Sequence, residues 1–192
     1  MSENISLHTF QFDIVHGCQL RCVGCPNSTI MDKVSRISLD DFRQCMENVD
    51  VENIQYFRLF NFGEPLLHEN LTEILAIIAS QPWRAEETEI STNAQHCNWD
   101  DLKDALALGV VDRLVVSCDG DGTAAQYEQL RPPGKWSKLL EFLERAATIA
   151  REVAPELQLI TRTITEDETS MARWRSILQP RGWTPEFRDW KI

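Results

Sequence analysis

Strand-like and helix-like segments alternate along almost the whole chain, and this alternation limits the fold more than any other feature of the sequence. The predicted strands are residues 8–14, 54–61, 87–92, 111–118, 157–164 and 184–190. The predicted helices are residues 38–49, 71–80, 100–108, 136–153 and 168–178. Ser38 and Asp100 are the predicted N-caps of the first and third of these helices. The alternation predicts an α/β fold with a parallel sheet, either an open doubly wound sheet or a curved partial barrel.

Length and charge narrow the class of protein further. The chain has 192 residues, so we expect one domain covering residues 1–192. Its formal net charge of −11 disfavours binding to nucleic acids and to anionic membranes by bulk charge. No apolar run approaches the roughly 20 residues that a membrane helix needs, and the first residues do not resemble a signal peptide. We therefore expect a cytoplasmic protein that binds neither nucleic acid nor membrane.

Three of the six cysteines, Cys18, Cys22 and Cys25, lie in one loop, residues 15–30, directly after the first predicted strand. In a reducing compartment, cysteines grouped in this way indicate a metal site rather than disulfides. A [4Fe–4S] cluster binds thiolates from a short loop, and three thiolates leave one iron open to a small molecule. A zinc site with His16 as the fourth ligand is the alternative that the spacing leaves open.

Polar residues and glycines also follow other predicted strands. Gly63-Glu64-Pro65 follows the second strand, Asn93 the third, and Asp119-Gly120 the fourth. In parallel α/β sheets, functional residues gather where the strands end. Arg162 lies within the otherwise apolar fifth strand, and a buried arginine requires an anionic partner. These residues are therefore candidates for one site.

Several motifs together resemble the radical S-adenosylmethionine (SAM) superfamily. The spacing C-x3-C-x2-C after a first strand is similar to that family's cluster motif, and residues 61–65 (Asn-Phe-Gly-Glu-Pro) are similar to its GGEP motif. Residues 115–120 resemble the fourth-strand element of the SPASM/twitch-type subgroup, and residues 127–134 match the stretch that follows it. That subgroup continues into a cysteine-bearing C-terminal domain, whereas this chain has no cysteine after Cys118.

Two positions depart from the pattern of the family. Phe62 replaces the first glycine of the GGEP motif, and Gly24 occupies a position that is often aromatic and lies near the adenine. The Gly-Glu-Pro part is intact, so the resemblance still implies SAM binding.

The resemblance implies a partial (βα)6 barrel of parallel strands with outer helices, and it implies a [4Fe–4S] cluster and SAM as cofactors. In such enzymes the reduced cluster cleaves SAM to a 5′-deoxyadenosyl radical, which abstracts hydrogen from the substrate. The implied metal ligands are Cys18, Cys22 and Cys25. The implied SAM contacts are Gly63, Glu64, Pro65, Ser91, Asn93, Ser117 and Arg162. The alternatives are an ordinary turn for the Gly-Glu-Pro segment and an internal salt bridge for Arg162.

Other residues near the strand ends are candidates for contacts with the substrate. Asp119, Asp121 and Arg131 are the predicted substrate contacts, and solvated turns or a plain loop are the alternative. Cys118, and similarly Cys97, is either a donor of a hydrogen atom to the substrate radical or a packed thiol.

The substrate and the overall reaction stay open at this point. A glycyl-radical-enzyme activase and a non-catalytic iron–sulfur or zinc binding module are the alternative functions. The expected partners are an electron donor such as flavodoxin or ferredoxin and a substrate that is a peptide, a protein or a small metabolite. A partial barrel has an open mouth, which a partner chain or the tail, residues 181–192, could cover.

Overall fold

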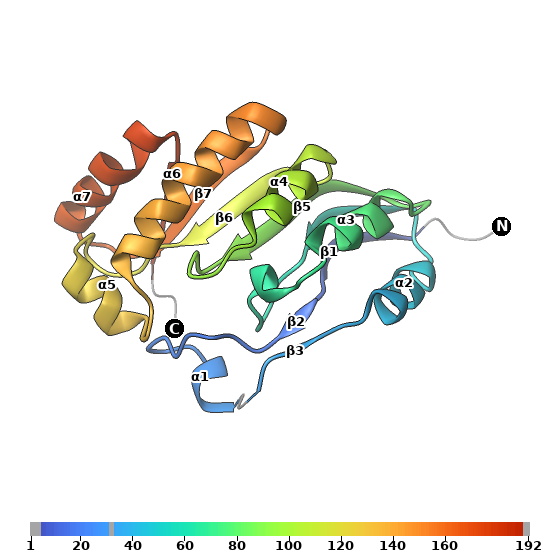
Figure 1. Cartoon of the computed structure of the whole chain (residues 1–192), viewed down its shortest axis with the longest axis horizontal. Coiled ribbons are helices and arrows are strands. Elements are labelled where there is room, and N and C mark those ends of the chain that lie inside the picture. The colour runs from blue at the N-terminus through green and yellow to red at the C-terminus, as the bar shows by residue number, and fades with distance from the viewer. Residues whose placement is uncertain (1–4, 31–32, 190–192) are drawn as a thin grey trace.

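The computed structural model describes residues 5–30 and 33–189. Six parallel strands form one sheet in the order β1-β4-β5-β6-β7-β8 (Figure 1). The strands are β1 (Ser6–Gln11), β4 (Asn53–Arg58), β5 (Arg84–Thr92), β6 (Arg113–Ser117), β7 (Gln158–Ile164) and β8 (Thr184–Arg188). The predicted partial barrel of parallel strands is confirmed, and β1 and β8 are its two open edges.

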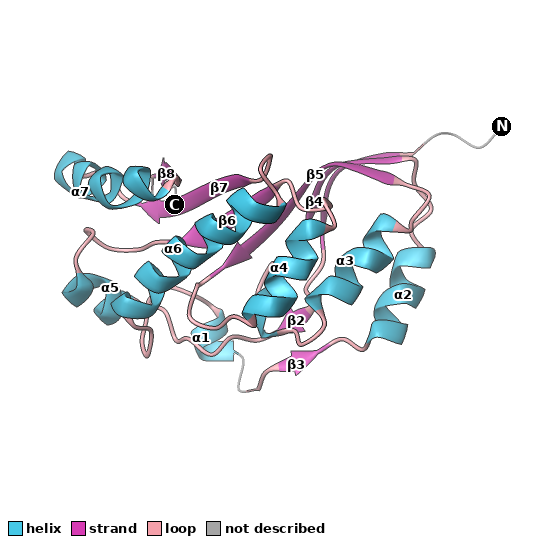
Figure 2. Cartoon of the chain, turned by 45° about the horizontal axis from the view of Figure 1, so that its top comes forward, coloured by secondary structure: helices cyan, strands magenta, loops and turns pink. Residues whose placement is uncertain are grey.

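Helices cover one face of this sheet. They are α2 (Leu39–Glu47), α3 (Leu71–Ala79), α4 (Trp99–Ala107), α5 (Ala124–Leu130), α6 (Trp136–Val153) and α7 (Glu168–Leu178). The helices α2, α3, α4 and α6 lie side by side in a row (Figures 1 and 2). None of the helices in residues 5–30 and 33–189 is both long and apolar enough to cross a bilayer.

The structure also contains short elements that the sequence did not predict. In and next to the cysteine loop they are β2 (Val15–His16), α1 (Asn27–Ile30) and β3 (Ser35–Arg36), and elsewhere they are the 3-10 turns η1 (Pro65–Leu67) and η2 (Gln179–Arg181). The helix α5 was also not predicted. Residues 184–188 pair with β7 and extend the sheet, and the predicted last strand reaches beyond them to Trp190, which lies outside the described residues.

One predicted helix cap is correct and one is wrong. The hydroxyl of Ser38 accepts a hydrogen bond from the backbone of Asp41 at 3.1 Å, as expected for an N-cap. The N-cap of α4 is Asn98 rather than Asp100. The carboxylate of Asp101 instead accepts the free backbone N–H groups at the start of α3, which links these two neighbouring helices.

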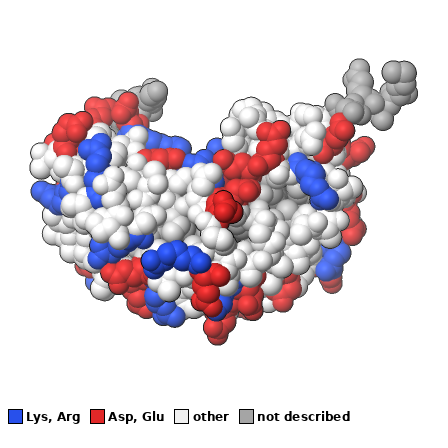
Figure 3. Space-filling model, turned by 90° about the horizontal axis from the view of Figure 1, so that it is seen from above, with Lys and Arg blue, Asp and Glu red and all other residues white. Residues whose placement is uncertain are grey.

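The two faces of the sheet differ because alternate residues of a strand point to opposite sides. On the helix side, Ile90, Leu114 and Val116 are fully buried in the hydrophobic core. On the opposite side, Arg113 forms ion pairs with Glu87 at 3.0 Å and with Glu186 at 2.6 Å. The inner face of the partial barrel therefore carries charged side chains, and these neutralise one another in ion pairs. Acidic and basic side chains are likewise interspersed on the face that Figure 3 shows.

Candidate functional site

A cavity of about 410 Å³ opens where the cysteine loop meets the carboxyl ends of β4, β5 and β6. Its volume lies in the range typical of small-molecule sites. The predicted site residues in its wall are Cys18, Cys22, Cys25, Gly63, Glu64, Ser91, Asn93, Ser117, Arg131 and Arg162. The structure thus brings the predicted metal ligands and most predicted SAM contacts to one place. Pro65 is the exception, because it is buried as the first residue of η1.

The cysteine loop is held by two backbone hydrogen bonds to the last residue of α5 and to the segment just after it. The N–H of Arg21 donates to the carbonyl oxygen of Pro132 at 2.6 Å, and the N–H of Val23 donates to that of Leu130 at 2.8 Å. The two donors lie on either side of Cys22, so these bonds fix the path of the loop between the cysteines.

The three thiols have the chemistry that an iron–sulfur cluster requires. They share one cavity wall, and burial raises the pKa of the Cys22 thiol to about 11 and also raises that of Cys18. A coordinating thiol is deprotonated by the metal itself, so a raised pKa does not prevent ligation. Within residues 5–30 and 33–189, no three His, Cys, Asp or Glu side chains surround a site for a single metal ion. His16, the predicted fourth zinc ligand, is exposed in β2.

Asp13 organises the turn that contains the Gly-Glu-Pro motif. Its carboxylate accepts hydrogen bonds from the backbone N–H groups of Asn61 at 2.7 Å, Phe62 at 3.0 Å and Gly63 at 3.1 Å. The turn also passes so close to β2 that a Cβ atom on Gly63 would lie 1.5 Å from the carbonyl oxygen of Val15. Only glycine fits this position without moving the backbone.

Glu64 is almost fully buried in the wall of the cavity. Its carboxylate accepts from the hydroxyl of Thr92 at 2.6 Å and from the backbone N–H groups of Asn93 at 2.7 Å and Leu66 at 3.2 Å. Burial raises the pKa of Glu64 to about 7, although these hydrogen bonds oppose the increase. A carboxylate offers about four acceptor positions, so one remains for a ligand. The backbone N–H of Glu64 donates to Gly17 at 3.0 Å, which links the turn to the start of the cysteine loop.

Asn93 lies between this turn and the first cysteine. Its side-chain nitrogen is 3.2 Å from the sulfur of Cys18, and its side-chain oxygen accepts from the backbone N–H of Gln95 at 2.9 Å. The backbone N–H of Leu20 also points at the sulfur of Cys18, at 3.4 Å. The predicted ligand residue Asn93 therefore contacts a predicted metal ligand directly.

Arg162 forms the internal ion pair that the sequence left as an alternative to a SAM contact. Its two terminal nitrogens are 2.5 and 2.9 Å from the carboxylate oxygens of Glu89, and its Nε is 3.0 Å from Glu186. The side chain of Glu89 is only 1% exposed, so this pair neutralises a buried charge. Arg162 also reaches the cavity wall beside Ser117, with which it is paired in register across β6 and β7.

Arg131 is the better placed cation for a ligand in the cavity. It is buried, its guanidinium is paired with Asp119, and its Nε has no partner within the described residues. It lines the first cavity and also a neighbouring cavity of about 560 Å³. Both cavities share Cys22, Cys25 and Ser117.

The second cavity has a more apolar wall than the first. Its aliphatic side chains are Val23, Leu130 and Ile164, and its charged side chains are Asp119 and Arg131. Val23 and Ile164 are among the most exposed large apolar residues of the described chain. A ligand bound in this cavity would lie directly beside a ligand bound in the first cavity.

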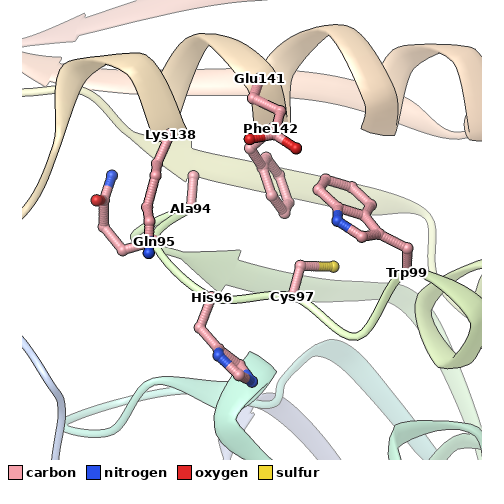
Figure 4. A pocket seen from close by; sticks show the side chains of 8 residues that line it. All are labelled: Ala94, Gln95, His96, Cys97, Trp99, Lys138, Glu141 and Phe142. Carbon is pink, nitrogen blue, oxygen red and sulfur yellow. The ribbon is translucent and has the colours of Figure 1, made fainter.

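Three other candidates point elsewhere. Asp121 accepts from Thr123 and is paired with Arg173 at 3.0 Å, and it lines neither cavity. Cys118 is completely buried in the core on the helix side of the sheet, which corrects the alternative that it faces the substrate. Cys97 lies in a separate pocket of about 210 Å³ beside α6, where its thiol points toward Trp99 (Figure 4).

Sequence reasoning missed three residues of the site. Asp13 holds the turn, Thr92 binds Glu64, and Asn27 donates to the carbonyl oxygen of Phe62 from within the cavity wall. Asp13 and Thr92 lie at the ends of predicted strands, and that position was a usable signal. Asn27 lies in the unpredicted helix α1, so no pattern could have found it.

Comparison with protein families matches residues 13–161 to the Radical SAM superfamily. Comparison with the curated proteins gives no significant match. Among solved structures, "Native anSMEcpe with bound AdoMet and Cp18Cys peptide" matches with a TM-score of 0.65 and 16% identity, over 96% of this chain and 51% of that one. "Native anSMEcpe with bound AdoMet" matches with a TM-score of 0.64 and 15% identity, over 95% and 51%. The chain therefore shares their fold and spans about half of their length.

Proposed function

Because the chain belongs to the radical SAM superfamily, we propose that it binds a [4Fe–4S] cluster and SAM in the first cavity. The observation that carries the proposal is that the thiols of Cys18, Cys22 and Cys25 share this cavity with one buried acid, Glu64, and one buried cation, Arg131. This arrangement combines cluster ligands with partners for both ends of an amino acid. The two solved structures described above hold AdoMet, which supports the same proposal.

The amino-acid end of SAM carries an ammonium and a carboxylate, and the cavity offers a partner for each. The remaining acceptor position of Glu64 receives the ammonium, since an ionised carboxylate binds a cation strongly. Arg131 with its unpartnered Nε, together with the hydroxyl of Ser117, receives the carboxylate. Arg162 is already paired with Glu89 and Glu186, so we assign it to holding the barrel rather than the ligand.

The cluster supplies, when bound, the electron that cleaves SAM to a 5′-deoxyadenosyl radical. The chain's own contribution is to hold the two cofactors beside each other and to limit access of water. Ser91 lies in the cavity wall on β5, where it contacts the ribose in our proposal.

The second cavity is the proposed substrate site, because it adjoins the first along Cys22, Cys25, Ser117 and Arg131. Its aliphatic wall favours a peptide, a protein segment or a small metabolite with an apolar part. Asp119, which lies in this wall, is the polar contact of the substrate, whereas Asp121 is no longer proposed for that role. An electron donor such as flavodoxin or ferredoxin and a partner chain that closes the mouth complete the proposal.

Anaerobic reconstitution with iron and sulfide, followed by reduction in the presence of SAM, tests the proposal. We expect about four irons and four sulfides per chain, and we expect release of 5′-deoxyadenosine detected by liquid chromatography. Cys22→Ala should lose the cluster and the product. Cys45→Ala is the matched control, because Cys45 is exposed on α2 away from the cavity. A chain that assembles a cluster but never cleaves SAM would instead be a binding module.

A further inference from the structure

The amide of Asn93 is aimed at the sulfur of Cys18, although the sequence predicted a contact with SAM for this residue. Its side-chain nitrogen lies 3.2 Å from that sulfur, within the range of an N–H···S hydrogen bond. Asn93 is only 4% exposed, so water does not compete for this contact. The residue therefore contacts the cluster ligand in the structure itself.

The orientation of the amide follows from its other partners. The backbone N–H of Gln95 lies 2.9 Å from the side-chain oxygen of Asn93. A backbone N–H can only donate, so the atom facing Gln95 must be the oxygen, and the atom facing Cys18 must be the nitrogen. The backbone of Asn93 is anchored separately, by its N–H donating to Glu64 at 2.7 Å. The donor is thus fixed in place before any cofactor binds.

The hydrogen bonding of the three cysteines is unequal. The sulfur of Cys18 receives the amide of Asn93 and the backbone N–H of Leu20 at 3.4 Å. Within residues 5–30 and 33–189, the sulfurs of Cys22 and Cys25 receive no hydrogen bond. The sulfur of Cys18 therefore has two hydrogen-bond donors that the other two sulfurs lack.

Hydrogen bonds to the sulfurs of an iron–sulfur cluster are one of the means by which a protein sets its reduction potential. Reduction adds negative charge, and a fixed N–H dipole stabilises the more negative state more strongly. We propose that Asn93 raises the reduction potential of the cluster through its bond to Cys18, an inference that rests on the proposed binding of a cluster. Asn93 is then a positioning residue that makes reduction of the cluster easier.

The test is an anaerobic redox titration of the cluster-loaded full chain without SAM, followed by electron paramagnetic resonance. Asn93→Ala removes the donor and keeps the backbone bond to Glu64. We expect about a tenfold lower ratio of reduced to oxidised cluster at a fixed potential, which is about 59 mV for a one-electron couple. Asn48→Ala is the matched control, because Asn48 is an exposed asparagine at the C-terminal end of α2 whose side chain bonds to Gln44, and its midpoint should equal that of the parent.

A second variant covers the case in which Asn93→Ala fails to assemble. Asn93→Asp keeps the shape and the acceptor for Gln95 and replaces the donor with a carboxylate oxygen, so its midpoint should fall at least as far. Midpoints of both variants equal to that of the parent would overturn the proposal. If the parent itself binds no cluster, the proposed function fails. If the parent binds a cluster and cleaves SAM while the variants keep its midpoint, only the role of Asn93 is lost.

Discussion

The ion pair between Arg162 and Glu89 makes a quantitative prediction about the fold. Among the described residues, Arg162→Leu would leave the carboxylate of Glu89, 1% exposed, with only a longer contact of 3.5 Å to Arg113. Removal of one partner of a buried pair costs ~3–5 kcal/mol, because the remaining charge stays buried. Since Arg113 remains and the Arg162 side chain is itself 16% exposed, we expect the lower end, about 3 kcal/mol.

Urea unfolding of the cluster-loaded chain, followed anaerobically by circular dichroism, measures this loss. With a slope of about 2 kcal/mol per molar urea, the midpoint should fall by about 1.5 M. Glu89→Gln combined with Arg162→Leu should recover most of the loss, because no unpaired charge is then buried. Arg188→Leu is the matched control, since the Arg188 side chain is 57% exposed, and it should change the midpoint little.

Two results would refute this reasoning. One is an unchanged midpoint for Arg162→Leu, and the other is a double variant as unstable as the single one. A variant that keeps its stability in the absence of SAM but binds SAM weakly would return Arg162 to the role that the resemblance first implied. Calorimetric titration with SAM on the same variant therefore decides between the two roles.

Three further predictions concern the cavity itself. The pKa of Glu64 is raised from 4.5 to about 7, so between these pH values the folded chain holds a proton that the unfolded chain has lost, and stability falls as the pH rises from about 4.5 to about 7. Glu64→Gln should therefore make the thermal midpoint less dependent on pH over this range. A pH dependence equal to that of the parent would contradict the assignment. Arg131→Leu should raise the SAM dissociation constant measured by calorimetry about tenfold or more, whereas Asp119→Asn should not. An Arg131→Leu variant that binds SAM as tightly as the parent would remove Arg131 from the site. Gly63→Ala should force the backbone away from Val15. It should weaken SAM binding more than it lowers the iron content of the chain. Full SAM affinity in this variant would show that the close approach is dispensable.

The order and type of the main elements were predictable because their signals are local. Alternating apolar residues mark the strands, and the five predicted helices are present with boundaries within a few residues. The short elements β2, β3 and α1 carry no periodic pattern, because each is only two to four residues long. Their existence depends on contacts with distant segments, such as Glu64 bonding to Gly17.

The sequence allowed most residues of the site to be predicted, but not the partner of each residue. Position after a strand placed Glu64 and Asn93 correctly in one cavity, and the resemblance placed Ser117 there. The partner of Arg162 could not be read from the sequence, because Glu89 lies two strands away and Glu186 on the opposite neighbour. Spacing alone also could not show that Cys118 faces the core, since one step along a strand reverses the direction of a side chain.

The contacts of the cysteine loop imply that the two proposed cofactors bind with mutual support. The loop is attached to the Gly-Glu-Pro turn through Gly17, and to the end of α5 and the segment after it through Leu130 and Pro132. These two attachment points lead directly to Glu64 and Arg131, the proposed partners of the ammonium and carboxylate of SAM. A cluster that fixes the loop therefore also fixes both partners and removes part of the ordering cost of SAM binding. Because linkage between two ligands is reciprocal, bound SAM must in turn stabilise the cluster by the same free energy.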